Sequence, residues 1–325
     1  MRELSYIDAA REALSEEMAR DPTIFVMGEG IGPRGGNFST TVGLHAQYGS
    51  ERLRDTPISE RGFTTLCIGA ALAGARPVVD AMFVDFALDG ISDLVNQASK
   101  MRWMSSGRLE VPLVVRACMG VFSSAAAHHS GSYYSFFAHI PGFQVVLPSS
   151  PADAKGLLKT ALRSRDPVIF LEHRALLATK GPVPDGEYLI PFGQAAIVHE
   201  GTDLTLVGLS AMVPKCLEVA RTLAAEGITV EVIDPRTVAP LDVATICASV
   251  KKTGRLLIVE EDYASCSVAA EIASRVGDES FDDLDAPIRR LHCGFAPAPY
   301  SPALEKAMAI STQTILQKIR ELLAE

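Results

Sequence analysis

The 325-residue sequence contains no run of about 18 apolar residues, which is the length that a membrane-spanning helix needs. It also has no excess of basic residues. Its formal net charge is −9, so no basic surface is present to neutralise the phosphates of a nucleic acid. The first residues lead directly into a charged amphipathic segment rather than an apolar leader. These absences predict a soluble, cytoplasmic protein that binds neither a membrane nor a nucleic acid.

Paired cysteines are missing as well. The six cysteines are scattered, and none forms the C-x-x-C pair that is typical of zinc ligands or of a redox-active disulfide. Most of them lie among apolar residues. We therefore expect buried free thiols.

Short β-branched segments alternate with longer Ala- and Leu-rich segments along the whole chain. This alternation predicts parallel sheets covered by helices, and the chain is long enough for two domains with separate cores. The segment 178–188 interrupts the pattern with prolines and a glycine and is the expected linker. We therefore predict an α/β fold with one parallel-sheet domain over residues 1–185 and a second over residues 186–325.

The individual elements follow from apolar periodicity and from helix start and stop signals. Buried strands are expected at residues 24–27, 78–83, 113–116, 145–147, 168–171, 204–207, 229–233 and 256–259. Helices are expected near residues 213–226, 243–253 and 267–276. Residues 302–323 are expected to form one amphipathic helix.

A glycine-rich segment follows the first predicted strand. Gly30–Gly35 matches G-x-G-x-x-G, which occurs where dinucleotides bind. That function needs the last glycine inside a helix whose N-terminus meets the pyrophosphate, whereas here Gly36 and Asn37 prolong the coil. Pro33 also removes one backbone donor. We expect a loop that borders a site, with nicotinamide-nucleotide binding as the minor alternative.

The segment D-T-P-I-S-E-R-G-F at residues 55–63 leads into a Gly- and Ala-rich helix. Within this segment, Ser59 has the properties of a helix N-cap and Glu60 those of a first-turn acid. A purely structural role for Glu60 is therefore one interpretation.

The rest of the chain favours a second interpretation. The segment 55–63 resembles the thiamine-activating motif in the β subunits of thiamine-diphosphate-dependent 2-oxo-acid dehydrogenases, which act on pyruvate, branched-chain 2-oxo acids or acetoin. Other matching segments include V-N-Q-A-S-K-x-R-x-M within residues 91–107, F-F-A-H-I-P-G-F-Q-V-V-L-P ending at Pro148, and D-P-R-T-V-A-P-L at residues 234–241. The resemblance extends over nearly the whole chain. It implies an N-terminal pyrimidine-binding domain of thiamine enzymes and a C-terminal transketolase-like domain.

The resemblance also implies a reaction and a cofactor site. The reaction is oxidative decarboxylation of a 2-oxo acid, with acyl transfer to the lipoyl-lysine of a dihydrolipoyl acyltransferase core. By the resemblance, Glu60 bonds to the pyrimidine ring of thiamine diphosphate and activates it, with Ile58 beside the cofactor. Glu29 matches an acidic position next to the cofactor. Phe86 matches an aromatic residue that stacks on the pyrimidine, with core packing as the alternative.

Two adjacent histidines are the other catalytic candidates. By the resemblance, His129 aligns with a histidine that faces the reacting ring and handles acyl intermediates and lipoyl-lysine, and His128 lies beside it in the same pocket. Two adjacent histidines are too few for a zinc site. An ordinary surface loop is the alternative. Gly131 stands where the family usually has glutamine.

The sequence contains no G-D-G motif, which in this family holds the diphosphate and Mg²⁺. The resemblance therefore implies that an α subunit supplies this motif and Mg²⁺, in a heterotetramer that contains a second β chain. A split transketolase-type subunit and a non-catalytic interaction subunit are the alternatives.

A monovalent cation such as K⁺ is a further candidate, since relatives bind one through carbonyl oxygens and a carboxylate. The positions that match are Leu113, Ala161, Leu162 and Asp166. Ser164 departs from the pattern, because an aspartate is common there.

Overall fold

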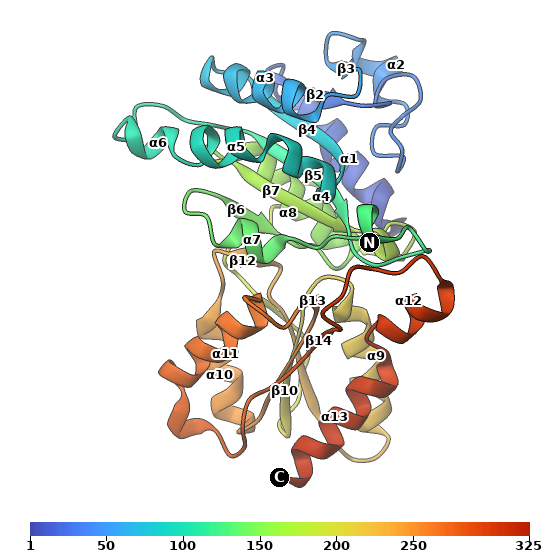
Figure 1. Cartoon of the computed structure of the whole chain (residues 1–325), viewed down its shortest axis with the longest axis vertical. Helices are drawn as coiled ribbons and strands as arrows, with labels where there is room; N and C mark the ends of the chain where they lie inside the picture. The colour runs from blue at the N-terminus through green and yellow to red at the C-terminus, as the bar shows by residue number, and fades with distance from the viewer. The chain divides into compact units, whose positions relative to one another are not determined.

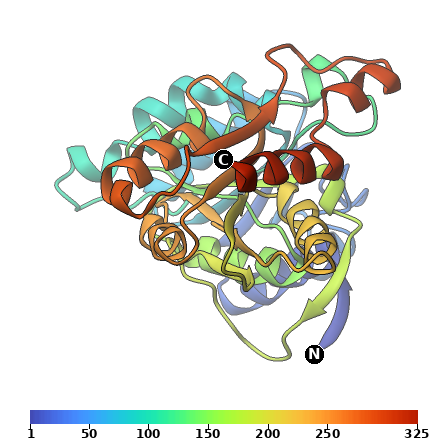
Figure 2. The same ribbon diagram turned by 90° about the horizontal axis from the view of Figure 1, so that it is seen from below.

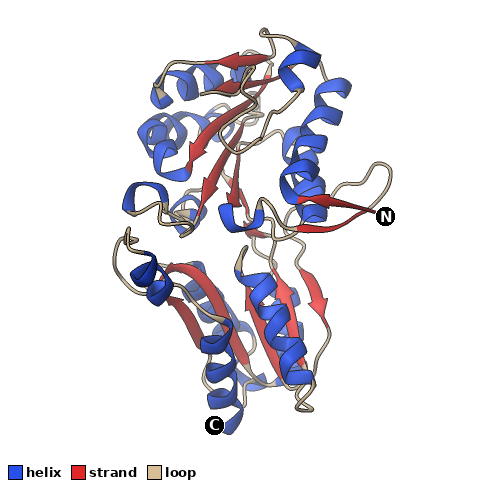
Figure 3. Ribbon diagram, turned by 90° about the vertical axis from the view of Figure 1, so that its right-hand side faces the viewer, coloured by secondary structure: helices blue, strands red, loops and turns tan.

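The computed structural model describes residues 1–325, and the chain divides into two compact units. The first unit comprises Met1–Gly120 and His128–Phe192, and the second comprises Val121–Ala127 and Gly193–Glu325. Each unit contains a largely parallel sheet with helices packed against it (Figure 1, Figure 3). The predicted fold class is thus confirmed. None of the helices combines the length and apolar character needed to cross a membrane.

The sheet of the first unit is parallel, with strand order β6-β7-β5-β4-β2-β3. Its central strands are buried on both faces, which is why they are almost continuously apolar in sequence. The five strands expected here are confirmed, with shifts at their ends, and β3 is an addition. The bounds are β2 Ile24–Gly28, β3 Leu53–Asp55, β4 Arg76–Phe83, β5 Val114–Met119, β6 Gln144–Val146 and β7 Val168–His173.

The α-helices of this unit are α1 Tyr6–Arg20, α2 Leu44–Tyr48, α3 Glu60–Leu72, α4 Val84–Ala87, α5 Ile91–Asp93, α6 Met101–Met104, α7 Tyr134–Ala138 and α8 Pro151–Arg163. Single turns of other helix types occur at Leu88–Gly90, Leu94–Ala98, Ala127–His129 and Arg174–Leu176. Helices α1 and α8 pack together through ion pairs, in which the buried Lys155 and Lys159 each bind Glu16 at 2.7 Å. The Glu16 carboxylate compensates for burial of the two lysine charges.

The expected linker at residues 178–188 contains a strand. Strand β8 (Lys180–Val183) pairs antiparallel with β1 (Arg2–Ser5) in a separate two-stranded sheet. Pro182 is tolerated because a strand in such a ribbon has a free edge, where a missing N–H costs no ladder bond. The boundary between the compact units lies later, between Phe192 and Gly193.

The second unit has a five-stranded sheet of order β14-β13-β10-β11-β9, in which β9 is the antiparallel edge strand. The three strands and three helices expected between residues 204 and 276 are confirmed, with shifts at their ends. The strands of this sheet are β9 Ala196–His199, β10 Leu204–Gly208, β11 Val230–Asp234, β13 Leu256–Tyr263 and β14 Arg289–Cys293, and the short strand β12 Thr237–Ala239 is not part of this sheet. The helices are α9 Met212–Ala224, α10 Val243–Thr253, α11 Val268–Glu279, α12 Pro302–Met308 and α13 Thr312–Ala324, with a 3-10 turn at Phe281–Asp283. Helix α13 packs against α9 (Figure 2).

The expectation of one helix over residues 302–323 is wrong. The helix breaks between Met308 and Thr312, because Ile310 turns into the core, where it is 5% exposed, and its carbonyl accepts a 2.7 Å hydrogen bond from Lys215 Nζ. Ser311 then caps the next helix by accepting a hydrogen bond from the N–H of Thr314.

All six cysteines are free, and four of them are buried. Burial raises the pKa of the Cys67 and Cys293 thiols to about 12 in each case, so these thiols stay protonated at neutral pH. Cys266 departs from the expectation because it is exposed.

Candidate functional site

The candidate residues of the first unit gather at the carboxyl edge of its parallel sheet. Gly28, the last residue of β2, is in register with Asp55 of β3 on one side and with Asp80 of β4 on the other. Glu29 follows β2 directly, and the segment leading to Glu60 follows β3. Ligands of parallel α/β sheets bind at this edge. The strand register therefore brings together two acidic residues that are 31 positions apart in the sequence.

Glu60 is the first residue of α3 and is half-buried, so its carboxylate lies at the positive end of the helix. The first-turn acid is thus confirmed. Ser59 occupies the expected N-cap position of α3, but its hydroxyl makes no capping hydrogen bond. Ser59 Oγ instead lies over Gly62, where an added Cβ would be only 2.7 Å from it. Ile58, just before this turn, is 83% exposed.

Glu29 carries a carboxylate oxygen, Oε1, that is buried and has no hydrogen-bond partner. Thr56 Oγ1 is likewise buried and unpartnered. Burial raises the pKa of Glu29, and the negative charges of Glu60 and Asp55 raise it further. Buried polar atoms without partners are uncommon in folded proteins. These two oxygens fit a site that receives a polar ligand.

This raised pKa predicts how Glu29 affects stability. The folded state binds the proton of Glu29 more tightly than the unfolded chain, so stability falls as pH rises from the unfolded pKa, about 4.3, through the folded one. We expect Glu29→Gln to melt at a higher temperature than the wild type at pH 8, with the difference shrinking towards pH 4. Melting curves of both proteins against pH would test this, with the exposed Glu51→Gln as control. A difference that does not depend on pH would contradict it.

An aromatic cluster stands at the ends of β4 and β5. The ring of His129 lies edge-to-face against Phe83 at 4.7 Å and against Phe86 at 5.3 Å. Phe83 and Phe86 are also edge-to-face, at 5.4 Å. Phe86 and His129 are half-buried and His128 is exposed. The structure thus brings Phe86 and His129 together, and Phe86 is not a fully buried core residue.

The glycine at position 131 is explained by its surroundings. Its N–H lies 3.2 Å from each oxygen of Asp85, and an added Cβ would come within 2.2 Å of the Tyr133 ring. A glutamine side chain therefore does not fit here in this conformation. Burial raises the pKa of Asp85, although the Gly131 N–H and the neighbouring side chains of His129 and Arg174 oppose the shift.

Arg174 was missed by the sequence analysis. Its guanidinium lies over the Phe83 ring, 5.3 Å from the centroid, and its Nη2 donates to the carbonyl of Gly120 at 3.2 Å. The signal that could have identified it is its position directly after β7, since that places it at the same edge of the sheet.

The glycine-rich segment Gly30–Gly35 is a loop, and the chain stays non-helical until α2 begins at Leu44. The N–H of Gly36 donates to the carbonyl of Gly30 at 2.8 Å. Gly36 has φ +84°, and an added Cβ there would be 2.3 Å from Thr40 Oγ1. No helix N-terminus follows the third glycine, so the dinucleotide fingerprint lacks its binding element.

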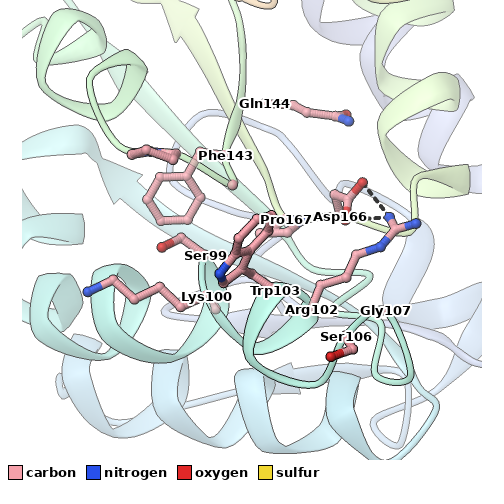
Figure 4. A pocket seen from close by; sticks show the side chains of 13 residues that line it. Ser99, Lys100, Arg102, Trp103, Ser106, Gly107, Phe143, Gln144, Asp166 and Pro167 are labelled. Atoms are coloured by element: carbon pink, nitrogen blue, oxygen red, sulfur yellow. Dashed lines mark hydrogen bonds and ion pairs between the residues drawn. The ribbon is translucent and has the colours of Figure 1, made fainter.

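Arginine nitrogens contact two of the four cation candidates, Leu162 and Asp166. Arg102 Nη1 contacts both oxygens of Asp166, at 2.6 and 2.7 Å (Figure 4). Arg76 Nη1 donates to the carbonyls of Leu162 and Ser164 at 3.1 and 2.8 Å. The carbonyls of Leu113 and Ala161 accept backbone N–H groups. These residues therefore do not present an open cation site in this structure, and no group of three or more His, Cys, Asp or Glu side chains that could hold a metal occurs in the chain.

Arg102 and Asp166 also line a cavity of about 1280 Å³, together with Trp103, Phe143 and Gln144 (Figure 4). Gln144 begins β6 and Pro167 precedes β7, so this cavity lies at the amino edge of the sheet. Glu29, Glu60 and His129 do not line it. The cavity is therefore separate from the candidate site.

The comparisons with known proteins give a match to the same enzyme class in both units. Residues 2–180 match the family described as "Transketolase, pyrimidine binding domain", and residues 193–315 match "Transketolase, C-terminal domain". The chain resembles a solved split-gene transketolase, an inactive β4 tetramer, with a TM-score of 0.81 and 21% identity over 99% of this chain and 98% of that one. At this identity the likeness shows the fold alone.

Curated relatives show the family. The chain is 42% identical to the 2-oxoisovalerate dehydrogenase subunit beta of Bacillus subtilis over 99% of each chain. It is 43% identical to the acetoin:2,6-dichlorophenolindophenol oxidoreductase subunit beta of Cupriavidus necator, over 98% of this chain and 97% of that one. It is 44% identical to the pyruvate dehydrogenase E1 component subunit beta of Rickettsia felis, over 97% and 96%. The chain belongs to the family of β subunits of the 2-oxo-acid and acetoin dehydrogenases.

Proposed function

We propose that this chain is the β subunit of a thiamine-diphosphate-dependent 2-oxo-acid dehydrogenase. The assembled enzyme decarboxylates a 2-oxo acid and passes the acyl group to the lipoyl-lysine of a dihydrolipoyl acyltransferase. The observation that carries the proposal is the acidic pair at the sheet edge: Glu60 at the N-terminus of α3, and Glu29 with a buried oxygen that lacks a partner.

The side chains at this edge fit a thiamine ring. When bound, the cofactor supplies an electron sink for the carbanion left by loss of carbon dioxide. Glu60 would hold a proton at the pyrimidine ring nitrogen through a charge-assisted hydrogen bond, which partial burial strengthens. Glu29, whose pKa is raised by burial and by the neighbouring carboxylates, would offer its unpartnered oxygen Oε1 to a polar group of the cofactor. Ile58 and Phe86 offer apolar surface to the ring.

His129 would act on the substrate side of the site. Histidine side chains transfer protons near neutral pH. The ring of His129 is held by aromatic contacts on two sides, from Phe83 and Phe86. These contacts fix the imidazole plane, so a proton can be donated or accepted at a defined position. The exposed His128 lies next to it and would contact a larger partner group such as the lipoyl arm.

The chain needs partners to complete this site. Its sequence contains no G-D-G motif, so we infer that an α subunit holds the diphosphate and Mg²⁺. We also infer an assembly with two α and two β chains that docks on an acyltransferase core. The cation expected near Asp166 forms no part of the proposal, because Arg102 already provides the positive charge there.

The sequence identities to the relatives do not decide which substrate this chain acts on. The identities to the 2-oxoisovalerate, acetoin and pyruvate relatives are 42%, 43% and 44%, which is too narrow a range to rank them. We therefore propose a 2-oxo acid as the substrate class. Acetoin is the second candidate, because that relative matches the chain over its whole length equally well.

Titration calorimetry with thiamine diphosphate and Mg²⁺ tests the shared site. We expect no binding by this chain alone and stoichiometric binding by the complex with its α subunit. That complex should then decarboxylate pyruvate, 2-oxoisovalerate or another 2-oxo acid with dichlorophenolindophenol as electron acceptor. Full-affinity binding by the α subunit alone would contradict the shared site. Ketol transfer between sugars without 2-oxo-acid decarboxylation would instead identify a split transketolase.

A further inference from the structure

The glycine loop, residues 30–43, borders the acidic side of the candidate site at its first residue. It begins directly after Glu29, and the N–H of Gly30 donates to Asp55 Oδ1 at 2.6 Å. Asp55 ends β3, and its negative charge is one of the causes that raise the pKa of Glu29. The loop therefore starts beside the acidic pair, although none of its residues has a role in the function proposed above.

Farther along, the glycine loop contacts the aromatic cluster. The half-buried ring of Phe38 lies edge-to-face on Phe83, with the ring centroids 5.1 Å apart. Phe83 in turn contacts the ring of His129. Next to Phe38, the side-chain amide of Asn37 donates to Met82 Sδ at 3.1 Å. One loop thus connects the acidic side of the site with its aromatic side.

A single buried carboxylate, that of Asp80, holds the glycine loop to strand β4. Asp80 is 9% exposed, and its Oδ2 accepts a hydrogen bond from Thr40 Oγ1 at 2.7 Å. Its Oδ1 accepts the N–H of Met82 at 3.2 Å. Hydrogen bonds in which the acceptor is a carboxylate are stronger than neutral ones. The loop and the end of β4 are therefore fixed to each other through one side chain.

Strand β4 is irregular where Asp80 holds it. Its register with β5 shifts between Asp80 and Phe83, and Met82 has φ +61°, a value that residues other than glycine rarely adopt. Bulges are common next to active sites, where they redirect a side chain. This irregularity lies directly before Phe83, so it sets the direction of the ring on which both Phe38 and His129 pack.

The glycine loop is compact, so that one anchor can fix its position. The N–H of Gly36 donates to the carbonyl of Gly30 at 2.8 Å, and the N–H of Thr41 donates to the carbonyl of Gly35 at 3.0 Å. Thr40 is 3% exposed, and its hydroxyl leaves no room for a side chain at Gly36. Loss of the bond from Thr40 to the carboxylate should therefore loosen the whole loop.

We propose that the glycine loop forms one wall of the pocket for the side chain of the substrate. Phe38 limits the size of the 2-oxo acid that fits, and Asp80 and Thr40 are positioning residues that hold Phe38 against Phe83. Phe38 packs on a ring that contacts His129, which acts on the substrate side of the site. The inference rests on the proposed function in taking the substrate to be a 2-oxo acid. In an apolar pocket, one methylene changes the selectivity by about tenfold or more.

The test compares Thr40→Val, Thr40→Ser and Phe38→Leu in the complex with the α subunit. Thr160→Val is the matched control. Thr160 lies on α8, where its hydroxyl donates to the carbonyls of Gly156 and Ile190, at 3.1 and 2.8 Å, rather than to a carboxylate beside the site.

Two quantities are measured for each variant. The first is hydrogen exchange of the Gly36 and Thr41 amides, which reports how firmly the loop is held. The second is the ratio of kcat/KM for 2-oxoisovalerate to kcat/KM for pyruvate. This ratio does not depend on the amount of folded enzyme, so a purely structural role of the loop would leave it unchanged.

Thr40→Val removes the hydroxyl at nearly unchanged shape. We expect about tenfold faster exchange of the loop amides, because the bond to Asp80 is lost. We also expect the ratio to rise about fivefold, because a displaced Phe38 leaves room for the branched substrate. Thr40→Ser keeps the hydroxyl and should match the wild type. Phe38→Leu should raise the ratio without faster exchange, and Thr160→Val should change neither quantity.

Three results would overturn the proposal: unchanged exchange in Thr40→Val, faster exchange in Thr40→Val with an unchanged ratio, or an unchanged ratio in Phe38→Leu. Should Thr40→Val fail to fold, the result for Phe38→Leu decides, since that substitution leaves the bond to Asp80 in place. Exchange requires no turnover, so its failure is distinct from failure of the proposed function. A wild-type complex that acts on no 2-oxo acid would overturn the proposed function and, with it, the size limit assigned to Phe38, whereas the anchoring by Asp80 is decided by exchange alone.

Discussion

Replacing Glu60 by glutamine is expected to lower turnover of the complex on its 2-oxo acid by about 100-fold or more. Glutamine has nearly the same shape, but its amide cannot hold a proton at the pyrimidine ring as a carboxylate does. The effect on folding should be small. An acidic residue in the first turn of a helix contributes only about 0.3–1 kcal/mol through the helix dipole.

The measurement is kcat of wild-type and Glu60→Gln complexes, with thiamine diphosphate affinity measured by calorimetry in parallel. Glu51→Gln is the matched control, because Glu51 is an exposed acid just before β3 that pairs only loosely with Arg54 at 3.7 Å. A melting temperature near that of the wild type would show that the fold is intact. Near-normal turnover of Glu60→Gln would remove the basis for assigning cofactor activation to this residue.

The largest effect on stability is expected from Arg116→Met, at about 3–5 kcal/mol of unfolding free energy. Arg116 and Glu172 lie on the adjacent strands β5 and β7 and are only 2% and 1% exposed. The guanidinium binds both carboxylate oxygens, one of them at 2.9 Å from Nη2. Removing the arginine leaves a buried carboxylate without its counter-charge, and the large energetic cost comes from that unpaired charge.

The double variant Arg116→Met/Glu172→Met distinguishes this explanation from a simple packing loss. It removes both charges at similar volume, so we expect it to be more stable than Arg116→Met alone. Urea denaturation followed by circular dichroism gives the unfolding free energies, provided that the transition of the first unit is resolved. If the double variant is less stable than the single one, the unpaired-charge explanation fails.

The regular elements were predictable because their signals are local. Strand β10 and helix α10 coincide closely with the expected ranges, since apolar periodicity and the capping residues Asp242 and Gly254 mark them in the sequence. The break before α13 also had a local signal, the capping Ser311, but the amphipathic pattern on both sides obscured it. Strand β8 had no local signal, because its partner β1 lies at the other end of the first unit's sequence.

The residues of the site could be predicted from the sequence, but the contacts between them could not. Resemblance singled out Glu29, Glu60, Phe86 and His129, yet no spacing rule places Glu29 beside Glu60, because this depends on strand order. The fit of Gly131 between Asp85 and Tyr133 depends on a contact across 46 residues of sequence. Predicting that Arg174 lies at this edge requires knowledge of which strand lies next to β5. Register and strand order are thus the information that the sequence pattern did not contain.

The contacts of the segment Val121–Ala127 have a consequence for the exchange of domains between relatives. This segment belongs to the second compact unit, where the N–H of Val121 donates to Glu261 and the N–H of Ser124 donates to Glu305. A chimera cut only between Phe192 and Gly193 would therefore separate the segment from these two carboxylates. Recombination within this family should treat Val121–Ala127, β13 and α12 as one inherited block, even though about 130 residues or more of sequence separate the segment from the strand and the helix.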